Sequence, residues 1–312
     1  MVRFRCARSR RLAAWLIAAS LVALVAAPAV TSARAFGEWG TAELESALNS
    51  AQADGCPIES FDGLSLYLAS TRPGAVGGDS DPNDIWVANR ASIDAPWQPA
   101  AHLPAPVNSA AADFCPLPLP GNKLFFVSSR SGAGACGAGD MYRTRNHPVQ
   151  GWLAPTNLGC VASGAGPNFA GGEFSPSLIE TDEGTYLYFS STGLDGLDQD
   201  IYVSAQNADG SFGPPSQVNE LSTGANDQMP NVSRDGLEIV FVSDRTGGAG
   251  GLDVYTAQRA TTADAWSAPT ALGPGVNTSA GESRPSLSGD GERLHFGRLG
   301  DIWVSTRSPV QP

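Results

Sequence analysis

The fold is decided by residues 266–305, WSAPTALGPGVNTSAGESRPSLSGDGERLHFGRLGDIWVS, because most of the chain after residue 35 repeats this pattern. The stretch contains a Trp-led segment ending in Val-Asn, an acidic-x-x-Pro motif, two short apolar segments joined by Asp-Gly, and a third segment that opens with Asp-Ile-Trp. Self-similarity at a fixed period is the sequence signature of a repeat architecture. The repeats are therefore the first guide to the fold.

The acidic-x-x-Pro motif occurs five times, at intervals of 59, 60, 54 and 55 residues. Its acidic residues are Asp54, Asp113, Glu173, Asp227 and Glu282. After each proline the sequence predicts a short strand, a tight turn, and a second strand in which apolar residues alternate. A third strand opens with Asp and an apolar-aromatic pair. The fourth is headed by an aromatic residue and leads to a polar one: Trp97 to Asn108, Trp152 to Ser163, Phe212 to Asn219, and Trp266 to Asn277.

Four strands per repeat of about 55 residues predict an all-β fold, a five-bladed β-propeller with four-stranded antiparallel blades over residues 36–312. The fifth repeat lacks its Trp-led strand. Trp39 and Asn49 supply that spacing at the other end, so we expect an N-terminal strand to close the ring. The alternative for residues 41–50 is a helix, because TAELESAL contains strong helix formers.

The repeats around Pro176, Pro230 and Pro285 carry a resemblance to a known family. Glu-x-x-Pro-Ser-Leu-Ser-x-Asp-Gly, an aromatic strand ending in Ser-x-Arg, and Gly-Gly-x-Gly-Gly-x-Asp-Val-Tyr resemble the WD-type propeller repeat of the TolB family. The resemblance covers residues 54–305 and implies a bacterial periplasmic or outer-membrane-associated protein. TolB itself has six blades and a separate N-terminal domain, so its partner contacts are not carried over to this chain.

Residues 1–35 read as an export signal, with five arginines, the apolar run 12–30, and Ala-Arg-Ala as a cleavage site. The alternative is an uncleaved membrane anchor. After residue 35 the chain holds 13 Lys and Arg against 31 Asp and Glu, a net charge of −18. Such a surface repels nucleic acid and anionic lipid. We therefore expect a periplasmic or secreted monomer with no further membrane span.

Four cysteines follow the signal, Cys56, Cys115, Cys136 and Cys160. An even number in an exported protein favours two disulfides, and three pairings are open. We favour Cys56 with Cys115, which occupy equivalent positions in neighbouring repeats, and Cys136 with Cys160, which lie in two loops of one repeat.

The five motif carboxylates are expected to form a ring around one mouth of the channel, and two interpretations follow. In the structural one, Arg72, Arg130, Arg245 and Arg298 pair with them, and the Asp of each third strand caps loop amides. In the functional one, they bind a ligand at the channel mouth. The third repeat has Thr192 where an Arg would stand and carries Asp195, Asp198 and Asp200, a candidate calcium site. Asp79, Asp81 and Asp84 offer a similar cluster in the first repeat.

Sequence signatures of catalysis are absent: there is no Gly-x-Ser-x-Gly elbow, no His-Glu-x-x-His and no P-loop. His102, His147 and His295 are interpreted as surface or packing residues, and the blade tryptophans as core rather than sugar platforms. We therefore predict a non-enzymatic binding or scaffold propeller that recognises a protein or cell-envelope component through its acidic loop face. The alternative is a carbohydrate-binding or glycoside-cleaving propeller that uses the channel-mouth carboxylates.

Overall fold

The computed structural model describes residues 1, 35–74, 83–132, 134–164, 166–193 and 196–310. The predicted export signal, residues 1–35, lies almost entirely outside the described residues. No described helix is long and apolar enough to cross a membrane.

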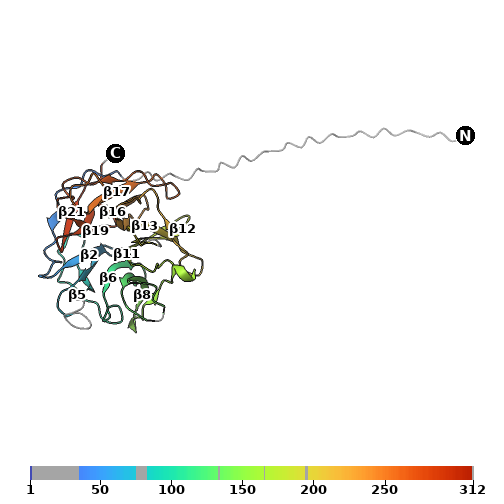
Figure 1. Ribbon diagram of the computed structural model, residues 1–312, viewed down its shortest axis with the longest axis horizontal. Coiled ribbons are helices and arrows are strands. Elements are labelled where there is room, and N and C mark those ends of the chain that lie inside the picture. The colour runs from blue at the N-terminus through green and yellow to red at the C-terminus, as the bar shows by residue number, and fades with distance from the viewer. Residues whose placement is uncertain (2–34, 75–82, 133, 165, 194–195, 311–312) are drawn as a thin grey trace. The chain divides into compact units, whose positions relative to one another are not determined.

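The chain forms five antiparallel sheets arranged as blades of four strands, which confirms the predicted propeller (Figure 1). Four blades run in sequence order from the centre outward, and the fifth takes β1 as its outermost strand. Blade 1 contains β2 (Asp54–Glu59), β3 (Ser65–Ser70), β4 (Asp84–Asn89) and β5 (Ala101–His102). Blade 2 contains β6 (Asp113–Leu119), β7 (Lys123–Ser128), β8 (Asp140–His147) and β10 (Thr156–Asn157), with β9 (Gly151–Trp152) as an extra short strand on β8.

Blades 3 to 5 repeat this order. Blade 3 contains β11 (Glu173–Thr181), β12 (Gly184–Ser191), β13 (Asp200–Ala205) and β14 (Ser216–Gln217), and is preceded by the 3-10 helix η1 (Val161–Ser163). Blade 4 contains β15 (Asp227–Val232), β16 (Glu238–Ser243), β17 (Asp253–Gln258) and β18 (Thr270–Ala271). Blade 5 contains β19 (Glu282–Leu287), β20 (Arg293–Arg298), β21 (Asp301–Thr306) and β1 (Glu43–Leu44).

The innermost strand of each blade begins at the motif's acidic residue, three residues earlier than the sequence predicts. All five pairings with the second strand shift register just after the acidic residue and its neighbour. The proline ends this irregularity, because a residue without an N–H is tolerated where a ladder is interrupted. The motif therefore encodes a β-bulge at the start of each inner strand.

The inner strands contact one another in the cyclic order β2, β6, β11, β15, β19 and back to β2, around the centre of the ring in Figure 1. Apolar clusters fill the space between adjacent blades. One of them joins Phe125 and Val127 of blade 2 to Leu187 and Phe189 of blade 3. Alternate residues of each middle strand thus face the blade before and the blade after, which is why both faces are apolar.

The fourth strands begin four residues after the aromatic residue that heads them, in every blade, from Trp97 to β5 and from Trp266 to β18. A buried side chain then bonds the N–H and C=O of a residue in the third strand, as Asn108 does with Ile85 and Asn277 with Val254. In blade 2 this residue is Asn168 and in blade 3 Ser222, where the sequence predicted Ser163 and Asn219.

The N-terminal segment closes the ring, as predicted. β1 pairs with β21, with Glu43 opposite Val304 and Leu44 opposite Trp303. Asn49 bonds Ile302 in the same manner as Asn108 bonds Ile85, with Nδ2 to O at 3.0 Å and N to Oδ1 at 2.7 Å. The alternative of a helix over residues 41–50 is wrong, because backbone pairing with β21 outweighs the local helix propensity and leaves only a turn at 46–48.

Replacing Asn49 by alanine should lower the free energy of unfolding by about 1–3 kcal/mol, because it leaves the N–H of Ile302 without a partner. The Ile302 carbonyl keeps the N–H of Glu45. Urea unfolding of Asn49→Ala against the wild type measures the loss. Gln52→Ala, at an exposed position three residues away, serves as the control and should change little. Equal stability of Asn49→Ala and the wild type would show that the ring does not depend on this closure.

Candidate functional site

The five motif carboxylates are buried, with exposed fractions between 0 and 3%. Each accepts a backbone N–H from the residue four positions earlier, in the link from the preceding blade. In four blades that residue is Ser or Thr, whose hydroxyl also donates, as Ser109 Oγ does to Asp113 at 2.7 Å. The carboxylates therefore anchor the chain between blades, and in this structure they are not accessible to a ligand.

Four of the five also pair with the predicted arginine at the end of the second strand. The pairs are Asp54 with Arg72, Asp113 with Arg130, Asp227 with Arg245, and Glu282 with Arg298. Each guanidinium also donates to a carbonyl of the link, as Arg72 does to Leu48 at 2.7 Å. This geometry supports the structural interpretation of the ring.

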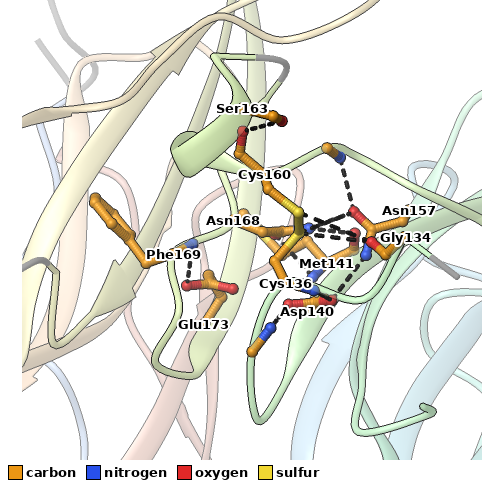
Figure 2. Close-up of a disulfide and its surroundings, with 12 residues drawn as sticks. Gly134, Cys136, Asp140, Met141, Asn157, Cys160, Ser163, Asn168, Phe169 and Glu173 are labelled. Atoms are coloured by element: carbon orange, nitrogen blue, oxygen red, sulfur yellow. Dashed lines mark hydrogen bonds between the residues drawn. A yellow bond between two sulfur atoms is a disulfide. The ribbon is translucent and has the colours of Figure 1, made fainter. Parts of the chain in front are cut away.

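Blade 3 is the exception that the sequence indicated. Thr192 replaces the arginine, and Glu173 is held only by Phe169 N–H and Ser191 Oγ, with Oε2 lacking a hydrogen-bond partner among the described residues. Burial raises the pKa of Glu173 to about 9, and the charge of Asp140 adds to that. Glu173 and Asp140 are the first residues of β11 and β8, of neighbouring blades (Figure 2). Glu173 is therefore a neutral acid at pH 7.

Beside Glu173, the predicted Cys136–Cys160 disulfide is confirmed (Figure 2). Asp140, the first residue of β8, accepts the N–H groups of Cys136 and Gly137, so it caps this loop as expected. The second predicted bridge is not formed. Cys56 and Cys115 are free thiols, with their Sγ atoms 2.7 Å apart.

The candidate calcium residues fall partly outside the described chain. Asp79, Asp81 and Asp195 are not described, while Asp198 is exposed and Asp200 is partly buried at the start of β13. Asp84 is buried and lies 2.5 Å from His102 Nε2. Within the described ranges, no group of three His, Cys, Asp or Glu side chains is placed to hold a metal ion.

The histidines and most aromatic residues take the structural places expected of them. His295 is buried, and burial lowers its pKa to about 4, so it is neutral although Glu59 lies 3.9 Å away. Trp97 and Trp266 are buried beneath Arg90 and Arg259. None of these is an exposed sugar platform.

A cavity of about 800 Å³ opens at the end of the channel opposite to the motif carboxylates. We call it the funnel. Its floor contains residues near the far ends of the inner strands, such as Leu117, Val232 and Leu287, and its rim includes hairpin-turn residues such as Phe61 and Pro120. The sequence analysis placed the binding face at the other end of the channel, where the acidic loops lie.

The funnel is lined by four basic side chains, Lys123, Arg143, Arg145 and Arg234. Lys123 stands directly opposite Arg145 in the pairing of β7 with β8, and Arg143 is two residues further along the same face. None of the four comes within 4.0 Å of a carboxylate oxygen in the described part of the chain. Like charges directly opposite in a sheet are destabilising, so this arrangement costs stability.

Arg234 spans the rim from blade 4 to blade 1. Its guanidinium lies 3.7 Å from the ring centroid of Phe61 and donates to the Phe61 carbonyl. Gly289 of blade 5 lies beneath, and a Cβ there would come within 2.1 Å of Arg234 Nη2. Phe61 remains 57% exposed, which leaves an aromatic surface beside the cations.

Among the residues that the structure describes, two carboxylates line the funnel, Glu59 and Glu180. Glu59 is buried and paired with Arg90 at 3.2 Å and Arg293 at 3.1 Å, while Glu180 is exposed at the end of β11. A glycosidase of the usual kind needs two carboxyl groups across one bond, free to exchange protons or attack. The charge of Glu59 is already matched by its two arginines.

The funnel residues were not predicted from the sequence, although the distribution of its positive charges indicates them. Of the 13 cations after residue 35, seven arginines pair with carboxylates, Arg284 is buried and Arg259 covers Trp266. The other four all line the funnel. Lys123 is the first residue of β7 and Arg145 lies near the end of β8, so two cations at the open end of one hairpin of an acidic protein indicated this place.

Comparisons with known proteins support the fold but do not assign a function. No protein-family model and no curated protein matches the chain. The catalytic domain of the GH62 α-L-arabinofuranosidase from Coprinopsis cinerea is similar in structure, with a TM-score of 0.56 and 14% identity, over 87% of this chain and 97% of that one. The endo-arabinase from Bacteroides thetaiotaomicron gives 0.52 and 14%, over 88% and 98%.

A putative TolB from Agrobacterium tumefaciens is also similar, with a TM-score of 0.46 and 15% identity, over 85% of this chain and 79% of that one. Likeness at such identities shows the fold alone. The resemblance to the TolB repeat in the sequence stays a prediction about the family.

Glu173 should make stability fall with rising pH. Its pKa in the folded protein, about 9, lies above the ordinary value of 4.5, so its contribution to stability is complete below pH 4.5 and is lost as the pH rises towards 9. Glu173→Gln lacks this loss. Urea unfolding at pH 5 to 8 should show the variant gaining on the wild type by up to about 1.4 kcal/mol per pH unit. Glu220→Gln, at an exposed position, should run parallel to the wild type. Parallel curves for Glu173→Gln would mean that Glu173 is ionised.

Proposed function

We propose that this protein is an exported, non-enzymatic binding propeller that recognises a protein or cell-envelope component through an anionic group held in the funnel. The observation that carries the proposal is the collection of Lys123, Arg143, Arg145 and Arg234 around one cavity, in a chain whose other cations are used internally.

The electrostatics of the chain sharpen this proposal. The protein carries a formal net charge of −12, and −18 after residue 35, so its surface as a whole repels anions. A basic funnel in an acidic surface admits an anionic group at one place only. Complementary charge of this kind sets specificity and association rate more than raw affinity.

The shape and lining of the funnel fit recognition of a group larger than a simple ion. Its volume, about 800 Å³, falls in the range of ligand sites. Exposed Phe61 and the apolar floor residues Leu117 and Leu287 offer contact area beside the charges. Arg143 is held by a 2.6 Å hydrogen bond to the Gly210 carbonyl, which limits its motion before a ligand arrives.

A glycoside-cleaving propeller is the second candidate, because similar structures with TM-scores of 0.50 or more include arabinofuranosidases and an endo-arabinase. The support is at the level of fold, and folds host many functions. The funnel offers one exposed carboxylate, Glu180, and one that is clamped by arginines, Glu59. Binding is therefore the function that the site supports better.

Labelled poly-L-glutamate, as an acidic protein probe, and labelled polygalacturonate, as an acidic glycan probe, should distinguish the two kinds of partner by fluorescence anisotropy. We expect one of them to bind at low salt and weaken with added salt. Lys123→Glu with Arg145→Glu should weaken that binding by at least about tenfold, equivalent to about 1.4 kcal/mol.

Two matched variants control this experiment. Arg145→Lys keeps the charge and should retain most of the binding, whereas Glu180→Gln removes the opposing charge of the same cavity and should strengthen it. Binding that is unchanged by the double charge reversal would place the site elsewhere. Failure of both probes to bind at low salt would contradict an anion-binding funnel.

Release of reducing sugar from arabinan and arabinoxylan tests the second candidate. We expect no release above the rate of heat-denatured protein, because Glu59 is neutralised by Arg90 and Arg293. Sugar release that is lost in Glu180→Gln would establish an enzyme and overturn the non-enzymatic proposal.

A further inference from the structure

The third residue of each acidic-x-x-Pro motif occupies the same place in all five blades. These residues are Cys56, Cys115, Ser175, Met229 and Arg284. Contacts join several of them across the ring, including Arg284 Nη1 to Ser175 Oγ at 2.9 Å and Arg284 N to Met229 Sδ at 3.3 Å. Arg284, Cys115 and Ser175 are at most 1% exposed, so side chains fill the channel at this level.

The backbone at these five positions favours glycine, yet none is glycine. Their φ angles lie between 42 and 57°, in the left-handed region. A residue with a side chain pays a conformational cost there that glycine avoids. The chain uses 36 glycines elsewhere. The five positions therefore carry side chains although the backbone conformation favours glycine. This cost suggests that the chemistry of these side chains matters.

Two of the five are thiols in contact. Cys56 and Cys115 come from the neighbouring inner strands β2 and β6, and their Sγ atoms are 2.7 Å apart. A disulfide needs about 2.05 Å, so a small displacement joins them. They differ in access, because Cys115 is fully buried while Cys56 is partly exposed. Cys56 is therefore the more accessible of the two residues.

The third group of this cluster is a buried cation without a carboxylate. Arg284 is 1% exposed and donates to Ser175 Oγ and to the Pro116 carbonyl, next to Cys115. No described carboxylate pairs with it, and its Nε has no hydrogen-bond partner. A buried charge needs a counter-charge. Cys115, whose Sγ lies 3.8 Å from the same Ser175 Oγ, is the group that can supply it as a thiolate.

The acidities of the two thiols agree with this geometry. Burial raises the pKa of Cys115, but the hydrogen bond from Cys56 and the charge of Arg284 outweigh burial and bring that pKa to about 6. The pKa of Cys56 is raised, because its S–H donates to Cys115 and because it is buried. Both shifts favour a thiolate on Cys115 and a thiol on Cys56.

We propose that Cys56 and Cys115 form a redox-active dithiol in the channel, with Arg284 as the positioning cation, and that small-molecule disulfides oxidise it to a bridge between blades 1 and 2. In the first step Cys56 Sγ attacks the disulfide RS–SR, its proton passes to Cys115 Sγ, and RS⁻ leaves. In the second step Cys115 gives its proton to RS⁻, attacks Cys56 Sγ and expels the second RS⁻, which takes a proton from solvent. Two thiols are oxidised and one disulfide is reduced to two RSH.

The bridge would tie β2 to β6, which are 59 residues apart in sequence, at a level of the channel separate from the funnel. The proposal therefore does not depend on the funnel binding a ligand. It also gives a physical reason for one arginine and two cysteines at positions that the fold makes equivalent.

Oxidised glutathione is the probe, applied to the full chain carrying Cys6→Ser after mild reduction that leaves Cys136–Cys160 intact, so that Cys56 and Cys115 are the two thiols counted. We expect two thiols per chain to disappear on counting under denaturing conditions, and peptide mapping to find Cys56 joined to Cys115. Dithiothreitol should restore both thiols. Cys115→Ser should stop at a mixed disulfide of Cys56 with glutathione, and Cys56→Ser should leave Cys115 unmodified.

The role of Arg284 is tested by the pH profile of oxidation, which a merely structural residue would not shift. Arg284→Lys should keep the profile. Arg284→Gln should move it to alkaline pH and slow the reaction at pH 7 by at least about tenfold, as the Cys115 pKa returns towards that of an ordinary thiol. Circular dichroism verifies that each variant is folded.

Two results overturn the proposal without need of any variant. One is the survival of both thiols in the folded wild type under conditions that oxidise the urea-unfolded chain. The other is glutathione retained on Cys56 while Cys115 stays reduced. If Arg284→Gln does not fold, the wild-type profile still tests the cation, because an oxidation rate that rises only near the pKa of an ordinary thiol, about 8.5, would contradict its role.

Discussion

The rest of the structure depends on one repeated interaction, in which a buried carboxylate ties three pieces of chain together. In four blades the acid that starts the inner strand accepts hydrogen bonds from the link behind it and pairs with the arginine at the end of the second strand. That arginine donates in turn to a carbonyl of the same link. Such charge-assisted bonds are stronger than neutral ones and cannot be broken singly without leaving a buried charge. Each blade is therefore set in place by the link that precedes it.

Much of the fold could be read from the sequence because the features that define a blade are local. The acid, the turn, the Asp of the third strand and the aromatic residue of the fourth fall at spacings that strand geometry imposes. The spacing of Trp39 and Asn49 indicated the closing strand. What could not be read was the start of the inner strands. The bulge there is a property of pairing with the second strand, and a proline was taken as a boundary when it marks an irregularity inside the strand. Asn168 was missed for a different reason. An insertion between Trp152 and Asn168 changes their spacing but not the contact of Asn168 with the third strand.

The site was less accessible to sequence reasoning. The five carboxylates attracted attention because they recur, and recurrence in every blade is what a structural role produces. Lys123, Arg145 and Arg234 recur nowhere, and their meeting depends on which ends of the hairpins face the channel. Even so, the exceptions to the repeat were informative. Thr192 was recognised as a missing partner, and its consequence in the structure is a buried Glu173 with no arginine beside it and a raised pKa. The general lesson is that departures from a repeat carry more functional information than the repeat itself.

The bulge has one further consequence. It brings the third motif residue of every blade to the same level of the channel with the same backbone geometry. The five positions nevertheless hold four different residue types. A nearly fivefold frame thus encloses an interior with no symmetry at all: two sulfurs on one side, a guanidinium on another, a hydroxyl and a thioether between. The side chains that face the channel therefore differ from one side of the ring axis to the other, although the blades around it are alike. A single codon at one of these positions would change the chemistry at the centre while leaving all five blades as they are.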